Sequence, residues 1–171
     1  MSEKKSRIKN LIRDYLLDEG ILREKITDSK IDFGFKFSFP PGPKGQGMSI
    51  FKPKDKDFIV ILIRIQISES QAKILNSLED NKKIQFFMDL RKYFLIKEVF
   101  YRIDVQNYRY EITKQIFLKN DEIISKNSIF KRIRKLYFCF MFSTTILHEY
   151  CWGKEMPSKK FVPDFDLSLY S

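Results

Sequence analysis

The sequence is short of the residues that build catalytic and metal sites: histidine occurs once and cysteine twice in 171 residues. His148 is followed by Glu149, but Trp152 stands where a zinc-protease motif needs its second histidine. No other imidazole can complete a metal site or a nucleophile–base pair. None of the 22 carboxylates stands out in an apolar run, where burial would raise its pKa. These absences predict a protein that is not an enzyme and uses no cofactor. An enzyme with a carboxylate site is the third alternative, after a protein-binding module and a nucleic-acid-binding module.

The spacing of the cysteines argues against a disulfide, and the length of the apolar runs argues against a membrane span. Cys139 and Cys151 fall in one predicted helix, so about 18 Å separates them along its axis, which is beyond disulfide reach. The longest late apolar run, Leu136 to Leu147, has 12 residues, whereas a membrane span needs about 20. No apolar run follows Met1, so we expect no signal peptide. The sequence predicts a cytoplasmic protein without a membrane span.

The composition fits one soluble domain with a strong positive charge. Apolar residues make up 43% of the chain and charged residues 32%, and the net charge is +10. Such a charge indicates nucleic acid as a candidate partner. The 23 lysines and 22 isoleucines against one alanine fit an AT-rich coding sequence equally well. We expect one domain over residues 1–152 and a separate C-terminal tail over residues 153–171.

Apolar alternation predicts five strands. The stretch 58–67 is almost continuously apolar and β-branched, which is typical of a strand in the interior of a sheet. Residues 31–39 and 48–52 precede it and complete a three-stranded antiparallel meander. Residues 99–106 and 108–118 are read as two further strands that turn at Gln106 and Asn107.

Helical spacing predicts helices over 3–19, from about 69 to 78, over 82–98 and over 126–152. Gly20 supplies a left-handed stop for the first, Ser68 and Gln71 form a capping box for the second, and Ser125 caps the last. The prediction is an α+β fold of order αβββαββα, a five-stranded antiparallel sheet with helices packed on one face.

Two of these helices carry more apolar residues than one core face needs. In the helix over 82–98 we expect five residues to face the core, and Phe86 and Tyr93 to lie nearly opposite. The five are Ile84, Phe87, Met88, Phe94 and Leu95. The last helix carries a second apolar face in its second half, which something besides the sheet must cover. The predicted protein interface consists of Phe86, Tyr93, Phe138, Phe142 and Ile146. We expect this face to bind an unidentified protein client or a second copy of the chain in a homodimer.

The alternative is a nucleic-acid surface built from basic and aromatic side chains. Its residues would come from the last two strands and from the first half of the last helix: Arg102, Tyr108, Arg109, Lys131, Arg134 and Lys135. The tail offers another cover for the last helix, because it holds the acidic Asp164 and Asp166 together with Phe161, Val162, Phe165, Leu167, Leu169 and Tyr170. It can fold back so that these carboxylates meet the basic turn of the helix.

Four short stretches, within about residues 6–150, carry a resemblance to a known family. They are Leu16-Leu-Asp-Glu-Gly20, Phe51-Lys-Pro-Lys54, Phe87-Met-Asp-Leu-Arg91 and Lys114-Gln-Ile-Phe117. With the order of elements, they make the chain similar to an uncharacterised archaeal protein family with a type III secretion chaperone-like fold. The resemblance implies no catalytic residues. The better-known members of that fold bind extended segments of partner proteins and commonly form dimers.

Overall fold

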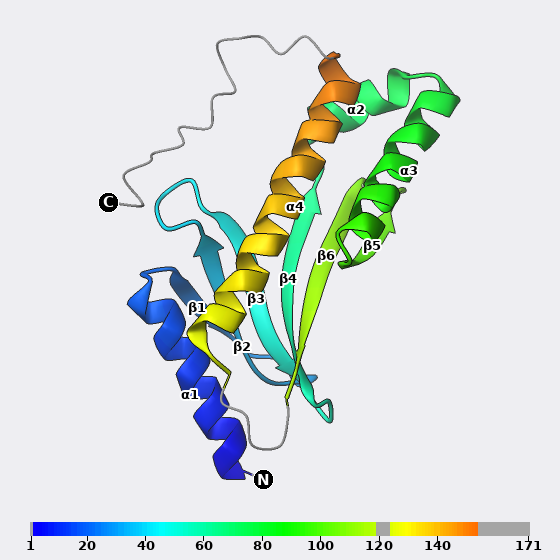
Figure 1. Ribbon diagram of the computed structural model, residues 1–171. Coiled ribbons are helices and arrows are strands. Elements are labelled where there is room, and N and C mark those ends of the chain that lie inside the picture. Colours follow the sequence, from blue (N-terminus) through cyan, green and yellow to red (C-terminus); the bar gives the residue numbers. More distant parts are fainter. Residues whose placement is uncertain (1, 119–123, 154–171) are drawn as a thin grey trace.

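Strand β4 (Phe58–Gln66) lies inside a six-stranded antiparallel sheet whose strand order is β1-β2-β3-β4-β6-β5 (Figure 1). The structure is a computed structural model that describes residues 2–118 and 124–153. The other strands are β1 (Leu22–Ile26), β2 (Ile31–Phe39), β3 (Gln46–Pro53), β5 (Phe100–Asp104) and β6 (Arg109–Phe117). The helices of the described residues are α1 (Ser2–Asp18), α2 (Glu69–Ser77), α3 (Asp80–Ile96) and α4 (Lys126–Trp152).

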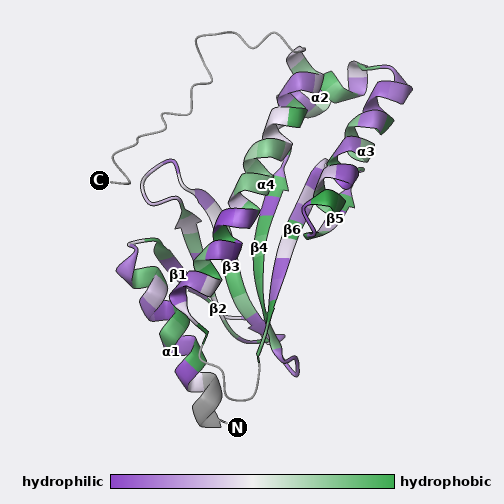
Figure 2. Cartoon of the chain, in the orientation of Figure 1, coloured by the Kyte–Doolittle hydropathy of each residue, from purple (hydrophilic) through white to green (hydrophobic). Residues whose placement is uncertain are grey.

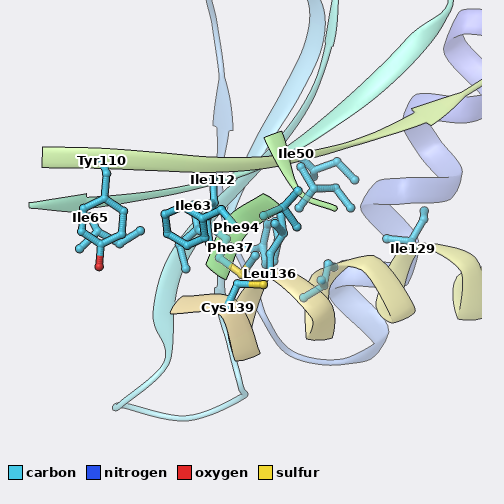
Figure 3. Packing of buried hydrophobic residues seen from close by; sticks show 14 of the residues in the cluster. Phe37, Ile50, Ile63, Ile65, Phe94, Tyr110, Ile112, Ile129, Leu136 and Cys139 are labelled. Carbon is cyan, nitrogen blue, oxygen red and sulfur yellow. The ribbon is translucent and has the colours of Figure 1, made fainter. Parts of the chain in front are cut away.

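The helices cover one face of this sheet, as predicted. Paired residues Phe37, Met48, Ile63 and Ile112 form one row across four strands, and all are buried. Buried side chains of all four helices join the same hydrophobic cluster, and α4 lies across the middle of the face (Figures 1 and 3). Since side chains alternate along a strand, the other face of the sheet carries most of the polar and charged residues of β4, β5 and β6.

The predicted strand count was wrong, because the sheet has six strands and the missed one is β1. Leu22, two residues after the helix stop at Gly20, begins a strand with the sequence Leu-Arg-Glu-Lys-Ile, which pairs antiparallel with β2. An edge strand of this kind is held by backbone hydrogen bonds, so its middle residues stay polar and exposed. Such a strand carries no apolar alternation.

The local signals for helix ends were predicted correctly. Gly20 has a φ of 66°, and the N–H groups of Gly20 and Ile21 close the last turn of α1. Ser68 and Gln71 form the capping box of α2. The hydroxyl of Ser125 accepts a hydrogen bond from the N–H of Ser128 at 3.1 Å and begins α4.

The predicted core face of α3 was wrong in part. Phe87 and Phe94 are buried as expected, but the stripe of Ile84, Met88 and Leu95 is exposed. The buried set of α3 is Phe86, Phe87, Leu90 and Phe94. Apolar residues occur almost all round this helix, and only its neighbours decide which side is covered.

We expect Ile61→Ala to destabilise the domain by about 2–5 kcal/mol, because Ile61 is fully buried in the middle of the sheet. The matched control is Leu17→Ala, whose side chain on α1 is 53% exposed and should change stability by less than about 1 kcal/mol. Urea unfolding followed by circular dichroism measures both. An equal loss in the two variants would contradict this assignment of the core.

Candidate protein-binding surfaces

Phe86 was predicted in the protein interface, and this is wrong. Its side chain is fully buried, and its ring packs at 4.9 Å from Phe87 and at 5.5 Å from Tyr150. The hydroxyl of Tyr150 donates to the carboxylate of Asp89 at 2.7 Å, which fixes this side of α3 against α4. Phe86 therefore holds the two helices together and is not available to a partner.

The other predicted interface residues lie on or beside the exposed side of α4. Phe138 and Phe142 are 56% and 48% exposed, and Ile146 is half-buried against the core. Tyr93, on α3, stacks on Phe142 with ring centroids 4.2 Å apart. The structure thus brings together four of the five residues that the sequence singled out.

On α4 these phenylalanines continue a basic stripe. Lys131, Lys135, Phe138 and Phe142 follow one another at helical spacing, so they lie on one side of the helix. We call these four residues the α4 ridge. Polar turns in the first half of α4 give way to apolar turns further along (Figure 2).

A second apolar surface lies on α3, on the far side from α4. Asp89 and Tyr93 face α4, so Ile84, Met88 and Leu95 point away from it. Their exposed fractions are 61%, 40% and 64%. We call these three residues the α3 stripe. The helical period of the sequence contains the stripe, but we assigned it to the core.

The α3 stripe lies beside an edge of the sheet that is open. α3 packs on β5, and β5 is the last strand in the sheet order. Within residues 2–118 and 124–153, no strand pairs with the outer edge of β5. Phe100 at the start of this strand is 61% exposed, but it alternates with the inward-facing Tyr101 and so lies on the sheet face that the helices leave uncovered.

The ladder between the strands identifies the backbone groups at that edge. At one end of the β4–β6 ladder, the N–H of Ile67 donates to the carbonyl of Tyr108 at 2.9 Å. Hydrogen-bonded pairs alternate along an antiparallel ladder, so even-numbered residues of β6 bond to β4 and odd-numbered ones to β5. Arg102 pairs with Glu111, an odd-numbered residue of β6, so its backbone N–H and C=O groups point towards β6. Tyr101 and Ile103 therefore direct theirs to the open edge.

The predicted nucleic-acid residues do not lie on one surface. Tyr110, the residue after Arg109, is buried under α4, so Arg109 points to the sheet face that the helices leave uncovered. Arg102 points to the same face, because it pairs with Glu111. Arg109 also pairs with Asp104 at 2.9 Å. Tyr108 bonds to Asn76 and lies under an ammonium group of α3. The predicted basic residues of α4, Lys131, Arg134 and Lys135, lie on the helical side.

Cations gather where α3 ends beside the middle of α4. Lys114 lies on the inner face of β6, and its ammonium donates to the carbonyl of Glu98. Burial lowers the pKa of Lys114, and the charges of Lys135 and Arg132 lower it further. Lys97 lies over the ring of Tyr93, 5.7 Å from its centroid. We call Lys97, Lys114, Arg132 and Lys135 the basic notch.

The described residues provide neither a metal cluster nor a helix that could span a membrane. The described residues contain no group of three or more His, Cys, Asp or Glu side chains that could hold a metal ion. The ring of His148 packs against that of Trp152, with centroids 4.6 Å apart. No helix within the described ranges is long and apolar enough to cross a membrane.

Comparisons with known proteins give a family and a fold. Residues 8–147 match the model of a family described as "Uncharacterized conserved protein (DUF2299)". A crystal structure of an uncharacterised protein from Methanothermobacter thermautotrophicus superposes with a TM-score of 0.76 at 20% identity. The match covers 84% of this chain and 99% of that one. No curated protein matches the chain.

The burial of Tyr110 under α4 predicts a loss of stability in alkali. Burial raises its pKa to about 12, although its hydrogen bond to Ser143 acts the other way. An unfolded tyrosine ionises near 10, so the folded state holds this proton more tightly. The contribution of protonated Tyr110 to the free energy of unfolding is complete below pH ~10 and declines as the pH rises towards 12.

We expect Tyr110→Phe to reduce this decline, because the variant has no proton to lose at that position. Urea midpoints at pH 8 and pH 10.5 measure the effect. A Tyr108→Phe variant serves as the control and should keep the wild-type decline. A decline of equal size in wild type and Tyr110→Phe would contradict the assignment.

Proposed function

We propose that this chain, which belongs to the DUF2299 family of uncharacterised conserved proteins, is a non-enzymatic protein-binding or scaffold module that works as a homodimer. The observation that carries the proposal is the α3 stripe, an exposed apolar helix face beside the open edge of β5. Exposed apolar patches on soluble domains commonly mark interaction sites, and open strand edges invite pairing.

A second copy of the chain fits this surface best, because β5 is complementary to itself. Antiparallel pairing of two β5 strands about Ile103 uses the backbone groups that point to the open edge. Arg102 then lies opposite the partner's Asp104, and Asp104 lies opposite the partner's Arg102. Centring the pair on Arg102 would place two guanidinium groups opposite each other, which is unfavourable. The paired strands would also bring the two α3 stripes side by side.

The resemblance to type III secretion chaperones supports the same function. Better-known members of that fold bind extended segments of partner proteins and commonly form dimers. Secretion chaperones are typically acidic, whereas this chain carries a net charge of +10. We therefore propose a client with acidic segments, which would approach the α4 ridge and the basic notch.

In solution we expect a particle of twice the 20.6 kDa chain mass, measured by light scattering after size exclusion. Met88→Glu should weaken the dimer at least tenfold, because a carboxylate would be buried between two α3 stripes. Phe138→Glu is the matched control, because it introduces the same carboxylate at an exposed apolar residue of α4 and should leave the dimer intact. Dissociation by Phe138→Glu alone would move the interface to α4. A wild-type monomer at all concentrations would overturn the dimer.

The register of the strand pair is tested by a disulfide. In a pair centred on Ile103, the two Ile103 Cα atoms face each other at about 5.5 Å, which is within disulfide reach. Ile103→Cys should therefore form a covalent dimer on oxidation. Tyr101→Cys lies on the same face of β5 but about 13 Å from its copy, so it should stay monomeric on a non-reducing gel. Equal cross-linking of both variants would reject this register.

The nucleic-acid alternative predicts binding to RNA or DNA that depends on salt. Phosphate contacts release counterions, so binding to RNA or DNA would weaken steeply with salt. Capturing partners from native lysate with and without nuclease separates the two functions. Partners that are lost after nuclease treatment would favour the alternative.

A further inference from the structure

The α4 ridge is basic at one end and apolar at the other. Lys131 and Lys135 lie towards the start of the helix, and Phe138 and Phe142 follow one and two turns later. The two phenylalanines are exposed, and the Tyr93 ring widens the apolar end by stacking on Phe142. The ridge therefore fits a segment that is apolar in one part and acidic in the next.

The basic notch holds more positive than negative charge. Lys135 lies 3.9 Å from the carboxylate of Glu98, which is itself 83% exposed. Among the described residues, Lys97, Lys114 and Arg132 form no ion pair with a carboxylate. Arg132 donates instead to the backbone and hydroxyl of Ser128. Four cations around one carboxylate attract an anionic group.

We propose that the C-terminal segment of the same chain, residues 154–171, docks antiparallel along the α4 ridge and places Asp164 and Asp166 at the basic notch. These residues lie outside the part of the chain that the structure describes, and the proposal rests on their sequence. Phe161 and Val162 come before the two aspartates. A chain that returns from the end of α4 meets the apolar end of the ridge first and the basic end afterwards, so the order of the residues matches.

The lengths also agree. Lys135 lies 17 residues before Trp152, which is about 26 Å along the helix. Asp164 follows Trp152 by 12 residues, and an extended chain of that length spans up to about 40 Å. Phe142 lies about 15 Å from Trp152, within reach of Phe161. The segment can thus cover the ridge without moving α4.

This inference does not depend on the proposed dimer, because the α3 stripe and the open edge of β5 lie on another side of the molecule. It implies that the ridge is covered by its own tail until a client with acidic and apolar residues displaces that tail. An intramolecular occupant competes at a high effective concentration, so only a client of matching chemistry would exchange with it.

Trypsin cleavage after Lys159 and Lys160 in the full chain tests the proposal, with products followed by mass spectrometry. We expect cleavage at least fivefold slower than in a synthetic peptide of residues 150–171, and independent of protein concentration. Added salt should accelerate it by screening the ion pairs. Cleavage at the rate of the peptide would overturn the proposal. Protection that increases with protein concentration would assign the tail to a second copy and also overturn it.

Charge reversal distinguishes docking from a change in folding. The paired change Lys97→Glu with Lys135→Glu makes the basic notch net negative and should accelerate cleavage severalfold, and so should Asp164→Lys with Asp166→Lys. Combining all four should restore protection, which a merely structural effect would not do. Lys9→Glu, on α1, is the control and should leave the rate unchanged. Circular dichroism of each variant verifies its fold, and failure of the combined variant to regain protection would reject the proposed contact.

Discussion

The packing of α4 across the inner face of β4 and β6 is the contact on which the other features depend. Ile61 and Ile63 of β4 are fully buried beneath the helices, and Tyr110 of β6 bonds to Ser143 of α4 at 2.8 Å. Leu136 packs in the same cluster as these residues (Figure 3). A 27-residue helix spans the sheet, so it covers the central strands and cannot cover the edges.

This arrangement explains why apolar surface remains outside the core. α3 fills the space between α4 and β5, and it uses the side that carries Phe86 and Phe94. Its opposite side then faces solvent at the edge of the sheet, where Ile84, Met88 and Leu95 are exposed. On α4, the side that turns away from the sheet carries Phe138 and Phe142. Both exposed surfaces follow from helices that are apolar on more sides than the sheet can bury.

The positive charge is arranged differently on the two faces of the sheet. On the uncovered face, Arg64 pairs with Glu111 at 2.6 Å and Arg109 pairs with Asp104, so the charges largely cancel. On the helical face, the basic notch gathers four cations near Glu98. The basic notch shares Lys135 with the basic end of the α4 ridge, where an acidic segment would be bound.

The sequence by itself determined the features that depend on near neighbours in the chain. The helix caps at Ser68 and Ser125, the stop at Gly20 and the meander of β2 to β4 were predicted, because capping and alternation are local. The exposed phenylalanines of α4 were also predicted, since the helical period alone places Phe138 and Phe142 away from the buried stripe.

Tertiary structure alone decided which surfaces are covered. β1 was missed because an edge strand is held by backbone pairing and needs no apolar pattern. The side of α3 that is buried, and the separation of Arg102 from Lys131, depend on where the sheet places each element. Periodicity tells how residues group around one helix, but only contacts between distant segments select the group that becomes core.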